Sequence, residues 1–437
     1  MARNRSRLTF VLSLLLMLFL AACNDQPSNN PTGVLDPNKQ YTVNFWEAFA
    51  TGTDKATLEA MTKQYQTLHP NVTVNLQAFD SSATLKAKLT SAVTAGKPPT
   101  IAQVYEGWTT QYQQTGALVS LQPLIGGKDG LKQADLLDFY APLLQDGQIG
   151  GVQYAMPFSE TDMVLYYNVD ALQKLGLTPP KTMRELEAEL TSVTKTDGSQ
   201  WGLSLTPSAD EWSILYKAFG GSDFVSADGQ RSTFATGPNS QKAKQALSEL
   251  APLVKAGAVH ITQDLHWQND FATQKSLFAI GTTADYSSLA SAIGSRFRWT
   301  AMPMPTGPSG PFTTLFGTNL ALFFGADADS QMAGWDYMKY LTSTEANTVL
   351  VRQAGYVPIR QSVFNSSTLQ DYYRKTPARK AGPQSLNSAF IASTLPAWEQ
   401  CRTIITTDFT AVLNGQSATD AALKNITDGC DAALAQG

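Results

Sequence analysis

The stretch that decides the fold is residues 41–105, which read YTVNFWEAFATGTDKATLEAMTKQYQTLHPNVTVNLQAFDSSATLKAKLTSAVTAGKPPTIAQVY. Apolar and polar residues alternate at 41–45 and again at 72–76, a pattern typical of strands. Apolar residues three and four apart predict a helix from Asp54 to His69-Pro70, and a second helix ends at Gly96. Residues 101–105 are a short apolar strand. This strand-helix-strand-helix-strand order demands parallel strands with helices on both faces.

A second unit of the same class follows a glycine-rich stretch at 147–151. Thr182 and Glu185 have the spacing of a capping box and predict the start of a helix. Further strands are predicted at 164–167, 202–205, 278–280 and 320–324. About 400 residues remain after the N-terminal segment, which is too many for one ordinary core and favours two lobes.

The N-terminus has the pattern of an export signal. Three arginines within the first seven residues precede a mostly apolar run at 8–20, which is too short for a comfortable membrane span. The run ends in Leu20-Ala21-Ala22-Cys23, which resembles a bacterial lipobox, so we expect cleavage after residue 22 and acylation of Cys23. Residues 23–40 would be the lipid anchor and a flexible tether. An uncleaved signal anchor with an accidental cysteine is the alternative.

Composition narrows the classes of partner. The net charge is −4 and no basic run follows the signal, so nucleic acid is not expected as a partner. Aromatic residues reach 10% while charged residues are only 16%, which fits an aromatic-lined cleft or simply a large core. Cys401 and Cys430 flank Gly415 almost symmetrically, so a disulfide across a helical hairpin and two separately buried thiols both stay open.

Several short segments, in a fixed order along the chain, match the sequence pattern of a known protein family. They are Asn44-Phe45-Trp46, Gly96 through Glu106, Leu165-Tyr166-Tyr167-Asn168, Leu175-Gly176-Leu177, Pro180-Lys181-Thr182, Tyr340-Leu341-Thr342-Ser343 and Gly355-Tyr356-Val357-Pro358-Ile359. From residue 41 to the C-terminus the chain thereby resembles the extracellular solute-binding proteins of ABC importers, in the cluster that includes glycerol-3-phosphate-binding and maltose-binding proteins.

The resemblance implies an α/β fold of the periplasmic-binding-protein type, with two hinged lobes and a ligand cleft between them. Lobe 1 would hold 41–155 and 314–350, and lobe 2 would hold 156–313 and 351–437. It also implies a monomer without cofactor or metal, anchored outside the cytoplasm in the periplasm or at the cell surface. Its partners would be ABC permease subunits with a cytoplasmic ATPase. Open α/β sheets bind ligands beyond the carboxyl ends of their strands, which independently indicates where to look.

Two candidate ligand residues stand directly after a predicted strand. Glu106 could accept hydrogen bonds from neighbouring hydroxyls, and the indole of Trp108 could stack on a sugar face. A solvated glutamate at a strand end is the alternative. Trp46 ends the first strand in the same way, although it could pack under the cleft. Trp212 is a further stacking candidate for which a core role is about equally plausible.

Further candidates come from the resemblance. Ser82 stands where glycerol-3-phosphate binders carry a tyrosine, and Thr161 where they carry a serine. The others are Thr283, Asp285 and Tyr286 in a turn after a strand, Gly317 and Thr318 at a lobe crossover, Tyr356 near the hinge, and Trp398 and Arg402 on one helix face. The spacing of the last two is like that of a Trp-x-x-x-Arg pattern in maltose-binding proteins.

Aromatic rings paired with carboxylates favour a carbohydrate, a sugar or an oligosaccharide, as the ligand. A phosphate site would need Arg, Lys or clustered backbone N–H groups; sn-glycerol-3-phosphate or a glycerophosphodiester is the alternative. No His-Glu-x-x-His, phosphate-loop or Gly-x-Ser-x-Gly motif is present, so we do not expect an enzyme. A glycoside hydrolase that pairs Glu106 with Glu160 or Asp285, and a structural lipoprotein without ligand, are the competing classes.

Overall fold

The computed structural model describes residues 34–105 and 107–436. Within these residues ten strands form one sheet, in the order β2-β1-β3-β11-β6-β9-β7-β8, with β10 paired to β6 and β12 paired to β11. Two short strands, β4 and β5, pair separately. The strands are β1 Tyr41–Glu47, β2 Val72–Ala78, β3 Ile101–Val104, β4 Gln148–Ile149, β5 Val152–Gln153, β6 Ala155–Asn168, β7 Trp201–Leu205, β8 Val259–Ile261, β9 Ser276–Thr282, β10 Trp299–Pro303, β11 Thr313–Leu322 and β12 Ala389–Phe390.

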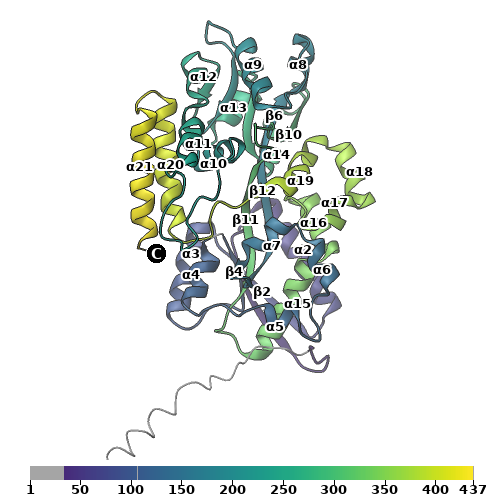
Figure 1. Cartoon of the computed structure of the whole chain (residues 1–437). Helices are drawn as coiled ribbons and strands as arrows, with labels where there is room; N and C mark the ends of the chain where they lie inside the picture. Colours follow the sequence, from purple (N-terminus) through teal and green to yellow (C-terminus); the bar gives the residue numbers. More distant parts are fainter. Residues whose placement is uncertain (1–33, 106, 437) are drawn as a thin grey trace, which may run out of the picture.

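Helices cover the sheet on both sides (Figure 1). In the first half they are α2 Gly52–Leu68, α3 Ser82–Thr94, α4 Trp108–Gln114, α5 Gln122–Ile125, α6 Gln133–Asp138, α7 Ala141–Asp146, α8 Val169–Leu175, α9 Met183–Val193 and α10 Ala209–Ala218. The others are α11 Pro238–Ser248, α12 Ala251–Lys255, α13 His266–Ala272, η1 Thr283–Asp285, α14 Tyr286–Ile293, α15 Ala328–Leu341, α16 Thr344–Gln353, α17 Gln361–Asn365, α18 Ser367–Lys375, η2 Pro377–Lys380, α19 Ala381–Ser385, η3 Leu386–Ser388, α20 Trp398–Leu413 and α21 Thr419–Leu434.

The first three strands confirm the pattern in the sequence. Strand β1 lies between β2 and β3, and both pairings are parallel. Its alternating residues are buried, and α2 buries Leu58, Met61 and Tyr65 as their spacing predicts. The capping box is present too, because the backbone N–H of Glu185 donates to the Thr182 hydroxyl at 3.2 Å and the Glu185 carboxylate accepts from the Thr182 N–H.

Two long strands join the lobes. The first half of β6 pairs with β11, and its second half pairs with β9 and β10. Strand β11 also runs antiparallel to β3, so the parallel arrangement expected from the sequence covers β1 to β3 and β7 to β9 but not the crossover strands. The strand predicted at 320–324 is the end of β11, which begins already at Thr313 and ends at Leu322. Figure 1 shows β6 and β11 passing from the lower lobe, which contains α3 and α4, to the upper lobe.

Each lobe has its own hydrophobic core. One core contains Phe45, Leu58 and Trp335 among others, and the second contains Leu203, Trp212 and Ile405. Val357 and Ile359 lie in the first core although they follow the predicted boundary at residue 350. The lobe boundaries stay predictions.

The chain ends in an antiparallel helical hairpin at the left of Figure 1, where α20 and α21 meet around a turn at Gly415. Its inner face buries both cysteines, Cys401 and Cys430, which are free thiols. Within residues 34–105 and 107–436, no helix combines the length and the apolar character that crossing a membrane requires.

Candidate functional site

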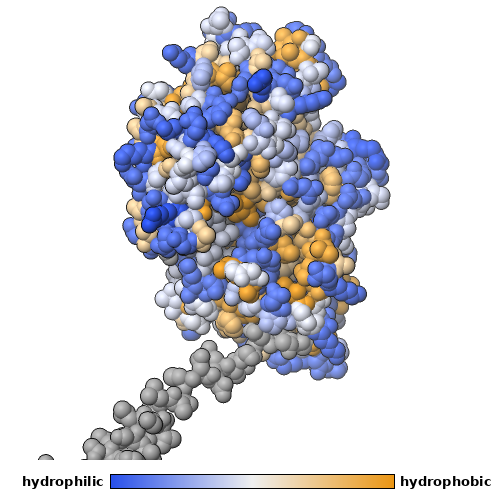
Figure 2. All heavy atoms as spheres, viewed as in Figure 1, coloured by the Kyte–Doolittle hydropathy of each residue, from blue (hydrophilic) through white to orange (hydrophobic). Residues whose placement is uncertain are grey.

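A cavity of about 380 Å³ lies between the lobes, close to the carboxyl ends of their strands. One wall carries residues of α3, the start of α4 and Tyr105 after β3, and the opposite wall carries Asp210 of α10 and the first turns of α20. Residues 314–317 of β11 and the segment 390–396 also line it. This is the position at which open α/β sheets bind ligands, and Figure 2 shows apolar residues gathered at mid-height where the lobes meet.

Aromatic rings face the cavity from both lobes. The Trp108 indole lies with its centroid 4.9 Å from that of Tyr105, and the Lys86 ammonium lies 5.4 Å from the indole centroid. On the other side, Trp398 is only 4% exposed and forms a T-shaped contact with Phe224, with the ring centroids 5.6 Å apart. Trp108 is therefore more accessible than Trp398 for stacking on a ligand, because Trp398 packs partly in the core.

An ion pair forms the polar side of the cavity. The two terminal nitrogens of Arg402 donate to the two carboxylate oxygens of Asp210, each at 2.6 Å. The guanidinium also lies 3.8 Å from the Glu399 carboxylate and 6.0 Å from the Phe316 ring. Burial raises the pKa of Asp210, and the charge of Arg402 opposes that rise. The pair fixes the orientation of both side chains, as a bidentate contact does.

A strap, defined here as residues 389–396, runs along the cavity and separates it from a second one. The strap begins with β12, which pairs with the start of β11, and it ends at α20. A Cβ atom at Gly107 would lie 3.5 Å from the Leu395 carbonyl oxygen, and one at Gly229 would lie 3.3 Å from the Leu395 side chain. The strap thus contacts residues of both predicted lobes.

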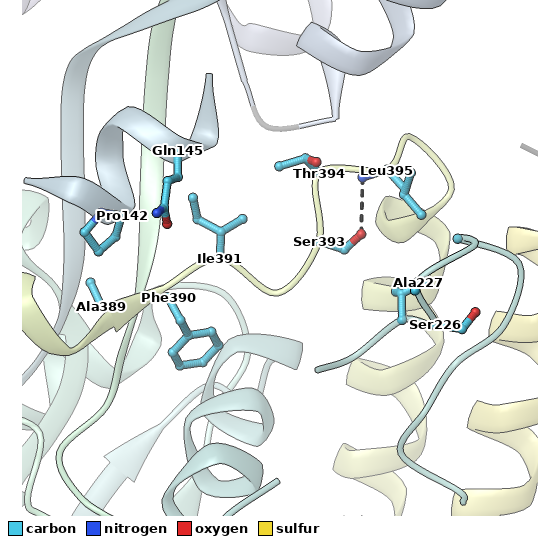
Figure 3. Close-up of a pocket in the computed structure, with 12 residues that line it drawn as sticks. Pro142, Gln145, Ser226, Ala227, Ala389, Phe390, Ile391, Ser393, Thr394 and Leu395 are labelled. Carbon is cyan, nitrogen blue, oxygen red and sulfur yellow. Dashed lines mark hydrogen bonds between the residues drawn. The ribbon is translucent and has the colours of Figure 1, made fainter. Parts of the chain in front are cut away.

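The second cavity measures about 520 Å³ and is shown in Figure 3. Pro142 and Gln145 of α7 approach the strap from one side, and residues 225–229 approach from the other. Phe390, Ile391, Ser393 and Leu395 line both cavities.

Five of the residues expected at the site line the first cavity. They are Ser82, Trp108, Gly317, Trp398 and Arg402. At Gly317, which was predicted to lie at a lobe crossover, a Cβ would lie 2.4 Å from the Glu160 carboxylate and from the Ser159 carbonyl oxygen. The neighbouring strand therefore already requires a glycine at this position.

The other described candidates do not line the cavity. Trp212 is fully buried and stacks on Tyr216 at 5.3 Å, which favours its core role. Trp46 packs edge-on against Phe79 at 5.3 Å. The Tyr356 hydroxyl donates to the Asp54 carboxylate at 3.1 Å.

The remaining candidates are held by local hydrogen bonds or ring contacts. The hydroxyl of Thr161 donates to the Phe316 carbonyl, and that of Thr318 is bonded to Ser159. Thr283 accepts from a backbone N–H of β6, Asp285 accepts from Thr282, and Tyr286 lies under the guanidinium of Arg379 at 4.1 Å. A direct role in ligand contact stays a prediction for all of them.

Two predicted residues, Glu106 and Cys23, lie outside the described residues, as does the signal segment before Cys23. Glu106 is flanked by Tyr105 and Gly107, which both line the cavity.

Sequence reasoning missed several residues of the cavity, namely Lys86, Asp210, Phe316, Glu399 and the strap. Lys86 follows Ser82 by four positions, so the helical period could have placed both on one face. Asp210 stands two residues before Trp212, which was a predicted site residue. No local pattern marks the strap, because its position depends on contacts distant in sequence. In the described part of the chain, no cluster of three or more His, Cys, Asp or Glu side chains is arranged to hold a metal ion.

Comparisons with known proteins agree with the fold described above. The sn-glycerol-3-phosphate-binding periplasmic protein of Yersinia pseudotuberculosis is 26% identical over 361 residues, 77% of this chain and 79% of the relative. The crystal structure of the cyclic alpha-maltosyl-1,6-maltose binding protein of Arthrobacter globiformis is similar with a TM-score of 0.78 at 22% identity, covering 91% of this chain and all of that one. A glycerophosphocholine complex from Mycobacterium tuberculosis has a TM-score of 0.75 at 19% identity, covering 90% and 98% of the two chains. The family model for bacterial extracellular solute-binding proteins matches residues 60–381, and the chain belongs to that family.

Proposed function

We propose that the protein captures a carbohydrate, a sugar or an oligosaccharide, by closure of its two lobes and delivers it without chemical change to an ABC importer. The observation that carries this proposal is the cavity between the lobes, with Trp108 on one wall and the Asp210–Arg402 pair on the other. Sugars present apolar faces and hydroxylated edges, so an indole and a fixed carboxylate with a guanidinium complement them. A ligand that touches both lobes stabilises the closed state by its higher affinity for it.

The proposal includes the lipid anchor and the importer. Acylation at Cys23 would hold the protein at the outer side of a membrane, and the permease with its ATPase would receive the ligand. The motif at residues 20–23 supports the anchor, and the family supports the importer.

A second candidate ligand is sn-glycerol-3-phosphate or a glycerophosphodiester. It is favoured by Lys86, whose ammonium lines the cavity and has no ion pair with any described residue. Arg402 argues against it, since its two terminal nitrogens already donate to Asp210 and a phosphate would have to compete for them.

The test is a thermal-shift screen of the mature protein with maltodextrins, other oligosaccharides, glycerol-3-phosphate and glycerophosphocholine. A ligand at a hundred times its Kd adds about 2.7 kcal/mol to the free energy of unfolding and should raise the Tm by roughly 3 °C. Trp108→Ala should weaken sugar binding at least tenfold. Trp201→Ala is the matched control, because Trp201 lies in β7, stacked on His260 at 3.8 Å and outside the cavity.

Chromatography of the recovered ligand separates binding from hydrolysis. Intact ligand is expected, and cleaved ligand would establish a glycoside hydrolase instead. If neither sugars nor phosphate compounds change the Tm, the proposal is wrong and the protein is better explained as a structural lipoprotein without ligand.

A further inference from the structure

We propose that the second cavity, between α7, residues 225–229 and the strap, is a binding site for the neutral, distal sugar units of an oligosaccharide whose first units occupy the cleft. This inference rests on the proposed function and specifies its ligand. The natural ligand is then an oligosaccharide that lies across the strap and not a single sugar.

A ligand in the second cavity would favour closure of the lobes because of where this cavity lies. Gln145 and Pro142 come from α7, whose Leu143 belongs to one hydrophobic core, whereas residues 225–229 follow Phe224 of the other hydrophobic core. An occupant therefore touches groups that belong to both lobes. Such contacts form fully only when the lobes are close together, so they stabilise the closed state.

The chemistry of the lining fits a neutral hydroxylated molecule. None of the side chains that line the cavity carries a charge. The Gln145 amide and the Thr394 hydroxyl have no hydrogen-bond partner among the described residues, so they can donate to and accept from ligand hydroxyls. Phe390, Ile391 and Leu395 supply apolar surface for the face of a sugar ring. By contrast, the first cavity contains Lys86, Asp210, Glu399 and Arg402.

The two cavities lie next to each other, separated by the strap. Four strap residues line both of them, and the strap is half-buried throughout. In Figure 3 the side chains of Gln145 and Ile391 extend toward each other across the space beside the strap. A linear molecule that crosses the strap from the first cavity would enter this space.

The test uses a series of neutral maltooligosaccharides with one to six units, titrated calorimetrically into the wild type and into the double variant Gln145→Ala, Thr394→Val. Wild-type affinity should rise with chain length. The double variant should lose about tenfold in affinity for the longer members, the equivalent of two hydrogen bonds, and nothing for the shortest that binds. Gln400→Ala is the matched control, because Gln400 is exposed on α20 and lines neither cavity.

The outcomes separate this inference from the function on which it rests. An equal loss for all lengths, no loss for any, or a wild-type affinity independent of length would overturn the second site and leave sugar capture intact. If the wild type binds none of the maltooligosaccharides but binds glycerophosphodiesters, the carbohydrate proposal itself is overturned. The Tm of each variant without ligand should equal that of the wild type, because Gln145 is exposed and Thr394 only half-buried.

Discussion

Raising the pH should destabilise the fold through Glu211, a carboxyl group buried beneath the cleft. Its side chain accepts a hydrogen bond from the Ser208 hydroxyl, and burial raises its pKa from the ordinary 4.5 to about 7. Between these two values the folded protein keeps the proton while the unfolded chain has released it. The folded state then binds more protons than the unfolded state, so stability is lost as the pH rises through this interval.

The size of the effect follows from the two pKa values. An interval of about 2.5 pH units at ~1.4 kcal/mol per unit corresponds to ~3 kcal/mol. An unfolding entropy of ~2.1 cal/mol/K per residue over about 400 residues converts this to a decrease of ~4 °C in Tm.

The assay is calorimetric unfolding between pH 5 and pH 8 of the wild type and of Glu211→Gln, which keeps the shape of the side chain and cannot titrate. About 2 pH units of the interval fall within this range, so the wild type should lose ~3 °C more than the variant. Other buried carboxyls titrate in both proteins and cancel in the difference, and Glu59→Gln, at an exposed position on α2, controls for the loss of a surface charge. Parallel curves for the wild type and Glu211→Gln would refute the reasoning.

Three further outcomes are expected. Arg402→Met should lower the free energy of unfolding by ~2 kcal/mol at pH 8 and by less at pH 5, because it leaves the buried carboxylate of Asp210 unpaired. Unfolding measured at the two pH values tests this, and an equal loss at both would contradict it. In an oxidising compartment the two buried thiols of Cys401 and Cys430, unbonded in this structure but in contact with each other, should form a disulfide, and closure of this loop would add ~3–4 kcal/mol; two thiols alkylated after denaturation would disprove it. Gly317→Ala should lower both Tm and ligand affinity, because a Cβ there would lie 2.4 Å from the Ser159 carbonyl oxygen; an unchanged Tm would contradict the packing argument.

The periodicity of the sequence was sufficient to predict the α/β architecture, but it did not distinguish the tryptophans of the cleft from those of the core. Trp108 and Trp212 both follow a strand and both stand near a carboxylate in sequence. Trp108 lines the cavity, whereas Trp212 is enclosed by Tyr216, Phe224 and Phe234. The difference arises from rings that are distant along the chain or on the hidden face of a helix, and a local pattern contains no information about them.

The crossover strands show a second limit of sequence reasoning. Residues 155–168 are almost continuously buried, so they have no alternation that could mark a strand with one exposed face. Only residues 164–167, near its C-terminal end, were predicted, although the first half of the strand pairs with β11 and the second half pairs with β9 and β10. The same long-range pairing decides the position of the strap, whose first residues are held by β11.

The continuity of β6 and β11 through both lobes determines where closure can take place. Rotation of the lobes has to be absorbed within these strands without loss of their ladder of hydrogen bonds. Their register shifts between Thr318 and Asn319, and a bulge is a point at which a strand can bend and twist. Gly317 lines the cavity beside this irregularity, so we expect the floor of the cavity to lie close to the pivot and to move little on closure. We expect Trp108 and Arg402, on opposite walls of the cavity, to move furthest relative to each other on closure. Contacts of a ligand with these walls would then differ most between the open and closed states, and on the proposed function this difference, more than the total contact area, would drive closure.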